Sequence, residues 1–156
     1  MVNTMETVFI LYKDFATEDE DCIGVFFDRE GLDEYLKENF LKVAKEDHSI
    51  LLRDYQSSIT QAQSDRWDLI SQEQELLKTE KKINDKYSSE YQTVHRKRVK
   101  IIKQIESINN MISELQYNFQ KEFNKDDDSI LKDYLENSGY VVHEAKVIER
   151  KNKPLN

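Results

Sequence analysis

A stretch of about 75 residues, from Ser49 to Asn124, contains neither glycine nor proline, the two residues that most readily interrupt a helix. In its second half, apolar residues recur in steps of three and four, which is the heptad spacing of a helix that packs against another helix. The sequence therefore predicts a long coiled coil. Its seam is formed by Ile101, Ile105, Ile108, Ile112, Leu115 and Phe119.

The first half of the stretch is less regular, because Arg66, Glu73 and Glu80 fall near seam positions. Helix-poor Asn, Asp and Ser gather at residues 84–91, which predicts a turn between two arms of similar length. The alternative is one uninterrupted helix that pairs with a second chain. The apolar positions of this half include Leu52, Tyr55, Ile59, Ala62, Trp67, Leu69, Ile70, Leu76, Leu77 and Ile83.

Two short apolar segments precede the stretch. Residues 6–13 and 23–27 are rich in Val, Ile, Phe and Tyr, so we expect two strands in antiparallel pairing. Asp28 is placed to cap an amphipathic helix that ends near Glu46 and covers one face of the sheet. The segment 45–49 breaks the pattern, so Asp47 or Ser49 is expected to cap a separate helix. The core side of the first helix is predicted to be Leu32, Tyr35, Leu36, Phe40 and Val43.

The end of the chain adds a short helix, 130–137, and a third strand, 140–149, with Gly139 between them as a helix stop. The third strand has no partner nearby in the sequence, so we expect it to join the first two. The sequence thus predicts an α+β fold: a three-stranded antiparallel or mixed sheet with helices, and a coiled-coil hairpin inserted before the last strand. The expected units are a head (1–48 and 126–150), a hairpin (49–125) and a frayed tail (151–156).

The segments VFILYKDF, IGVFFDREGLDEYLKENF and GYVVHEAKVIE resemble small ββα…β domains of uncharacterised bacterial and bacteriophage proteins. The resemblance covers about fifty residues, including Ile23 to Phe26, and this chain differs by its long helical insertion. It implies a phage-like protein and no catalytic residues.

Composition excludes several classes of protein. Charged residues make up 35% of the chain and there is one cysteine, so neither a membrane span nor an internal disulfide is expected. Three scattered glycines cannot form a phosphate-binding loop. His48, His95 and His143 lie about fifty residues apart, unlike the short spacings of zinc ligands, and Cys22 at the start of an apolar strand is expected to be a packed residue. We therefore predict a cytoplasmic protein with no enzymatic activity, metal or cofactor.

Charge is unevenly distributed along the chain. Residues 1–54 carry a net charge of −8, whereas residues 78–103 carry +6, against −8 for the whole chain. The sequence predicts a basic contact patch at the turn of the hairpin and an acidic contact patch in the loop between the first two strands. The basic patch comprises His95, Arg96, Lys97, Arg98, Lys100 and Lys103, and the acidic patch Glu18, Asp19, Glu20 and Asp21.

Three functions agree with this distribution. The first is a non-enzymatic protein-interaction module, such as a phage protein that modulates a host protein through a DNA-mimicking acidic surface. The second is nucleic-acid binding through the basic patch, and the third is a structural role as an oligomer, for instance a homodimer. For the basic patch, the alternative without any ligand is that it pairs with Glu73, Glu75 and Glu80 across the hairpin.

Overall fold

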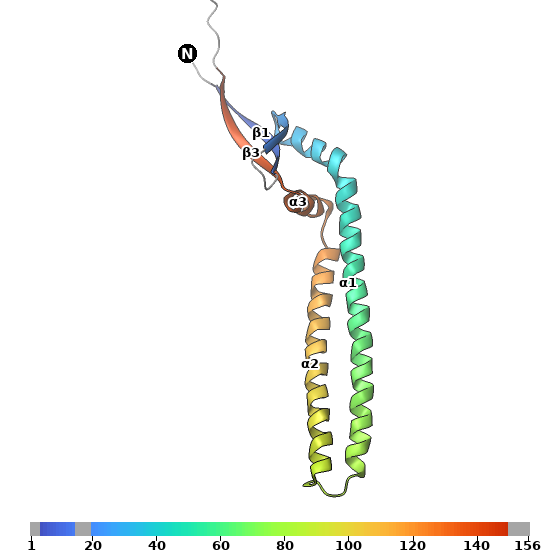
Figure 1. The fold of residues 1–156 in the computed structure, drawn as a ribbon. Coiled ribbons are helices and arrows are strands. Elements are labelled where there is room, and N and C mark those ends of the chain that lie inside the picture. Colours follow the sequence, from blue (N-terminus) through green and yellow to red (C-terminus); the bar gives the residue numbers. More distant parts are fainter. Residues whose placement is uncertain (1–3, 15–19, 150–156) are drawn as a thin grey trace, which may run out of the picture. The chain divides into compact units, whose positions relative to one another are not determined.

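The computed structural model describes residues 4–14 and 20–149 (Figure 1). Its three strands form one antiparallel sheet in the order β2-β1-β3, and the helical hairpin α1/α2 is inserted before the last strand, so the predicted α+β fold is confirmed. Contacts within the chain divide it into two units, the head (1–49 and 125–156) and the hairpin (50–124). The elements are β1 (Thr4–Asp14), β2 (Glu20–Phe26), α1 (Arg29–Lys82), α2 (Ser89–Phe123), α3 (Asp127–Asn137) and β3 (Tyr140–Glu149).

The core of the head lies on one face of the sheet. Phe9 of β1 pairs with Phe26 of β2, and Leu11 pairs with Val142 of β3, and opposed residues of antiparallel strands point to the same side. This face packs against the start of α1 and against α3, so the predicted helical cover of the sheet is confirmed. The buried residues of this core are Leu11, Leu32, Leu36, Ala44, Ile130, Leu131 and Leu135. Of the predicted helix residues, Val43 is 42% exposed, and Ala44 is buried beside it.

The other face of the sheet is also apolar. It carries Ile10 and Tyr12 in β1, flanked by Val25 in β2 and by Val141 and Val147 in β3. The three valines are 50%, 37% and 48% exposed, whereas Val8 of the central strand, on the same face, is 5% exposed, so it is the flanking strands of this face that are open to solvent. A face of an antiparallel sheet that meets only water normally carries polar side chains.

The prediction that a helix ends near Glu46 is wrong, because α1 runs without a break from Arg29 to Lys82. The polar residues at 45–49 are exposed or half-buried and neither Gly nor Pro is among them, so nothing prevents the helix from continuing. Ser49, expected as a cap, instead donates its hydroxyl to the carbonyl of Lys45 one turn earlier, at 2.9 Å. The predicted cap at Asp28 is confirmed, since its carboxylate accepts a hydrogen bond from the Gly31 N–H at 2.6 Å.

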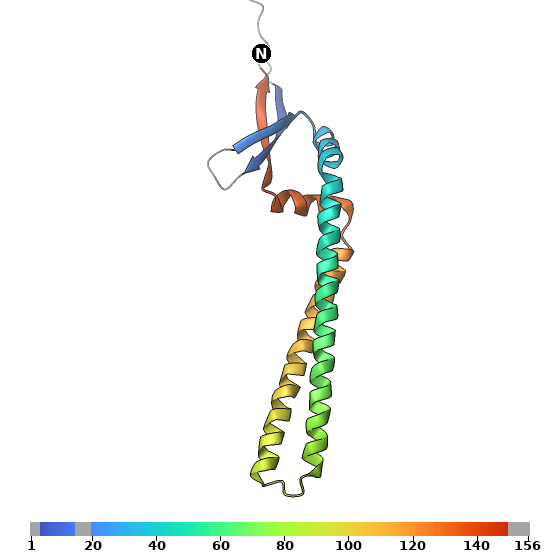
Figure 2. The same ribbon diagram turned by 45° about the vertical axis from the view of Figure 1, so that its right-hand side comes forward.

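The second part of α1 and the whole of α2 run antiparallel and form a hairpin (Figure 2). This rules out the alternative of a single uninterrupted helix across the stretch. All six predicted seam residues of α2 are buried or half-buried, with Ile112 only 4% exposed. The heptad pattern of this arm is therefore confirmed.

Three polar residues occupy the seam of α1 at intervals of seven, and each finds a partner on α2. The Arg66 guanidinium donates to the Asn109 side-chain oxygen at 3.2 Å, and Glu73 and Glu80 both accept hydrogen bonds from Arg98. Trp67, which the apolar pattern included, is 64% exposed and lies outside the seam. The polar residues that interrupt the apolar pattern of α1 therefore form contacts with α2, and these contacts fix the alignment of the two helices.

Candidate functional site

The turn of the hairpin is a short loop closed by its own hydrogen bonds. The Asp85 carboxylate accepts from the Tyr87 N–H at 2.9 Å, and the Asp85 carbonyl accepts from the Ser88 N–H at 3.1 Å. Ser88 caps α2, because its hydroxyl oxygen accepts from the Tyr91 N–H at 3.1 Å. The Gln92 side chain also donates to the Lys86 carbonyl at 3.1 Å. The loop therefore has a defined conformation.

Next to the loop, Glu80 is the centre of a polar cluster between the two helices. Its carboxylate is 9% exposed, accepts from the Arg98 Nε at 2.7 Å and from the Tyr91 hydroxyl at 3.1 Å, and lies 3.3 Å from His95 Nδ1. Arg98 also donates to Glu73 at 3.2 Å. Each residue of the cluster thus has a polar partner within the hairpin.

The cluster alters the acidity of its members. The hydrogen bond from Arg98 lowers the pKa of Glu80, and this outweighs burial, which acts in the opposite direction. The same contact, together with the one to Glu73, raises the pKa of Arg98, and the hydrogen bond to Glu80 raises the pKa of Tyr91. Glu80 is therefore an anion and Arg98 a cation at neutral pH, and together they form a neutral pair.

The predicted basic patch is divided by this geometry. His95 and Arg98 turn toward the seam, where they contact Glu80, whereas Arg96, Lys97, Lys100 and Lys103 are exposed. The alternative in which the basic patch pairs with carboxylates across the hairpin, without any ligand, thus holds for Arg98, which pairs with Glu80 and Glu73. It does not extend to Glu75, which pairs with Lys78 one turn further along the same helix at 3.4 Å.

Residues 78–103, which we call the basic tip, still present a strong positive charge. Within them only Asp85 and Glu90 are exposed carboxylates. Because the Arg98–Glu80 pair is neutral, the net charge of +6 is carried by side chains in contact with solvent. The exposed cations of the basic tip are Lys78, Lys81, Lys82, Lys86, Arg96, Lys97, Lys100 and Lys103.

One side of the hairpin forms a shallow groove beside this charge. The groove has a volume of about 650 Å³ and an apolar floor that includes Leu76 and Ile101. Lys97 and Lys100 line it from α2, and Glu75 is the one carboxylate among its lining residues. Two members of the predicted basic patch are thus brought together on one surface.

The predicted acidic patch falls largely outside the residues that the structure describes. Glu18 and Asp19 are not described, and Glu20 is the first residue of β2, opposite Asp14 of β1. Asp21 is exposed, and it is paired in the sheet with Lys13 of β1. The acidic patch therefore stays a prediction.

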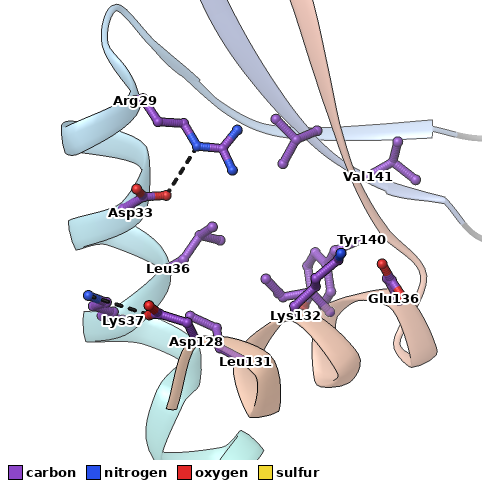
Figure 3. A pocket seen from close by; sticks show the side chains of 12 residues that line it. Arg29, Asp33, Leu36, Lys37, Asp128, Leu131, Lys132, Glu136, Tyr140 and Val141 are labelled. Atoms are coloured by element: carbon purple, nitrogen blue, oxygen red, sulfur yellow. Dashed lines mark ion pairs between the residues drawn. The ribbon is translucent and has the colours of Figure 1, made fainter. Parts of the chain in front are cut away.

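The head contains a cleft of about 660 Å³ between α1, α3 and β3 (Figure 3). Its floor is apolar and includes Leu36, Leu131 and Val142. The charges at its rim are balanced, with three cations and three carboxylates. Two of the cations already form ion pairs, Arg29 with Asp33 at 3.4 Å and Lys37 with Asp128 at 3.7 Å, as the dashed lines show. This rim offers no excess charge to a ligand.

Cys22 is exposed, so the expectation that it packs inside the head is wrong. It pairs with Tyr12 on the open face of the sheet. In the described part of the chain, no group of three or more His, Cys, Asp or Glu side chains is arranged to hold a metal ion. Across the same residues, no helix combines the length and apolar character needed to cross a bilayer.

Comparison with protein-family models, with curated proteins and with solved structures gives no match for this chain.

Proposed function

We propose that this chain is a non-enzymatic protein that binds nucleic acid through the phosphate groups, using the basic tip of its hairpin. The observation that carries the proposal is the separation of charge at the tip: Arg98 is neutralised inside the seam, while eight other cations face solvent against two carboxylates. Protein chains that bind nucleic acid without reading its sequence do so with such clusters of Lys and Arg. The proposed setting is the cytoplasm.

Phosphate binding by the tip has a definite dependence on salt. Each phosphate neutralised releases condensed counterions, so the logarithm of the binding constant falls with the logarithm of the salt concentration, with a slope of about −0.7 per phosphate on single strands and about −0.9 on duplex DNA. A tip that engages about four phosphates would therefore lose roughly 50-fold in affinity for a single strand, and roughly 150-fold for duplex DNA, over a fourfold increase in salt.

Reversing the charge of Arg96, Lys97, Lys100 and Lys103 to Glu is expected to abolish this binding. Fluorescence anisotropy of a labelled oligonucleotide at low salt measures it. The matched control reverses four exposed cations outside the tip, Lys42, Arg53, Lys121 and Lys132. Both variants have the same net charge, so a general electrostatic effect would weaken them equally. Equal weakening, or no binding by the unmodified chain at low salt, would contradict the proposal.

A second candidate function, protein interaction, is favoured by the open face of the sheet. The middle of this face carries exposed valines and His143, whereas the register places Glu6 and the acidic residues Asp14, Glu20 and Glu149 toward its ends. An apolar exposed patch is a frequent sign of an interface. We propose that a second copy of the chain covers it, because the largely apolar middle parts of two identical faces can meet about a two-fold axis, with the acidic residues left at the margin, although the chain as a whole carries −8.

The double substitution Val25→Glu and Val141→Glu is expected to convert this dimer to a monomer, because carboxylates buried between two apolar faces lose their hydration without a partner. Sedimentation velocity over a range of protein concentrations measures the change. Met111→Glu, on a 44% exposed residue of the hairpin, should leave the dimer intact. An unmodified chain that sediments as a monomer at all concentrations would refute this candidate.

A further inference from the structure

Tyr87 lies at the turn of the hairpin with 94% of its surface exposed, the largest exposed fraction among the large hydrophobic residues described. Its backbone N–H is held by Asp85, and the neighbouring Ser88 is held by the same residue. The loop conformation thus depends on backbone groups of Tyr87 and on the Asp85 side chain. The phenol ring has no part in forming the loop.

The other tyrosine of the tip is already engaged. The Tyr91 hydroxyl donates to Glu80, and its ring stacks on His95 with centroids 5.8 Å apart and planes inclined by 9°. Tyr91 is half-buried and belongs to the structural cluster of the seam. Among the residues of the basic tip, Tyr87 is therefore the aromatic ring with an open face.

An exposed aromatic ring surrounded by cations suits single-stranded nucleic acid better than a duplex. Unpaired bases can leave their neighbours and stack on an aromatic side chain, while cations hold the adjoining phosphates. In a duplex the faces of the bases are covered by neighbouring base pairs, so a single exposed ring gains nothing beyond the ends. The backbone of Tyr87 is held by an ordered loop, so only the side chain itself must be ordered when a base stacks on it.

We infer that the hairpin tip is a site for single-stranded nucleic acid, in which an unpaired base stacks on Tyr87 and the exposed cations of the tip hold the flanking phosphates. This inference rests on the proposed function and adds the form of nucleic acid recognised and the residue responsible. The lysines closest to Tyr87 in the sequence are Lys86 in the loop and Lys81 and Lys82 at the end of α1.

The test compares two labelled probes, an oligothymidylate and a blunt duplex, by fluorescence anisotropy at several salt concentrations. Tyr87→Ala is expected to weaken binding of the single strand roughly fivefold or more, which is the usual effect of removing one stacking ring. The slope of affinity against salt should not change, because no cation is removed. Tyr87→Trp should retain or strengthen binding, and Tyr117→Ala, which removes a 69% exposed tyrosine of the hairpin outside the tip, should have no effect.

A second readout detects stacking directly. In a chain that carries Trp67→Phe and Tyr87→Trp, the single tryptophan lies at the tip, and its fluorescence should be quenched by the oligothymidylate and not by the duplex. Unchanged affinity of Tyr87→Ala for the single strand, or an equal loss for both probes, would overturn the stacking site and leave phosphate binding intact. Failure of the unmodified chain to bind either probe at low salt would overturn the proposed function as well.

Discussion

Replacement of Leu11 by alanine is expected to lower the free energy of unfolding of the head by about 3 kcal/mol. Leu11 lies in the central strand of the sheet, is fully shielded from solvent and belongs to the same buried cluster as Leu32 and Leu36. Truncation removes apolar contacts and leaves a cavity that the surrounding strands and helices can only partly fill. For a small domain, this is a large fraction of the total stability.

Hydrogen exchange followed by mass spectrometry can assign this loss to the head, because peptides of β1 and β3 are separate from those of the hairpin. A loss of 3 kcal/mol corresponds to about 100-fold faster exchange of the strand amides. Val147→Ala, which truncates a 48% exposed residue of β3, is the control and should have a much smaller effect. Similar acceleration by both variants would show that the core does not lie on the face of Leu11.

Replacement of Glu80 by alanine is expected to destabilise the hairpin by about 2 kcal/mol. The substitution leaves Arg98 half-buried with Glu73 as its remaining carboxylate, and it removes the acceptor of the Tyr91 hydroxyl. The expected value lies below that of a fully buried ion pair, because the Arg98 side chain is 20% exposed and water can partly solvate it. Urea unfolding followed by far-ultraviolet circular dichroism measures the loss.

The double substitution Glu80→Leu and Arg98→Leu should restore part of this stability, because no unpaired guanidinium remains at the seam, although the Tyr91 hydroxyl and Glu73 still lack their partners. Glu75→Ala, which breaks only the exposed pair with Lys78, is the control and should change the unfolding free energy little. A double variant less stable than Glu80→Ala would mean that the polar cluster itself stabilises the hairpin more than apolar packing can.

The lowered pKa of Glu80 also predicts how hairpin stability depends on pH. In the unfolded chain the carboxyl has its ordinary value of 4.5, and in the folded hairpin Arg98 lowers it. Above pH 4.5 the stabilisation is complete, and it is lost as pH falls from there through the folded-state pKa. Acid titration of the unmodified chain should therefore show a greater loss of stability below this pH than titration of Glu80→Ala.

The parts of this fold that the sequence predicted correctly are those set by local pattern. The seam of α2 follows from the apolar spacing of Ile105, Ile108 and Ile112, and the start of α1 follows from the short polar side chain of Asp28 next to an amphipathic segment. These features depend on residues within two turns of one another. The partner of β3 was also predictable, because the two other strands expected from the sequence lie near the start of the chain.

The incorrect or missing predictions concern features that depend on distant contacts. The polar residues at 45–49 resemble a break, but the helix continues through them. Pairing of the basic patch with Glu73 and Glu80 was one of the alternatives, but only the alignment of the two helices shows that Arg98 is the cation that pairs with both. The exposure of Cys22 depends on which sheet face the helices leave open, and periodicity in a strand with apolar residues on both sides does not distinguish the two faces.

The polar contacts of the seam, which recur every seven residues, restrict which insertions and deletions the hairpin can accommodate. If one arm alone gained or lost seven residues, the apolar residues of the two helices would still face each other. Arg98 would, however, move by seven residues along α1, either toward Arg66 or past Glu80. The first shift brings two guanidinium groups together, and the second separates Arg98 from Glu73. Insertions and deletions in relatives of this chain should therefore occur in both arms at once, in matched units of seven residues, with the turn itself unchanged.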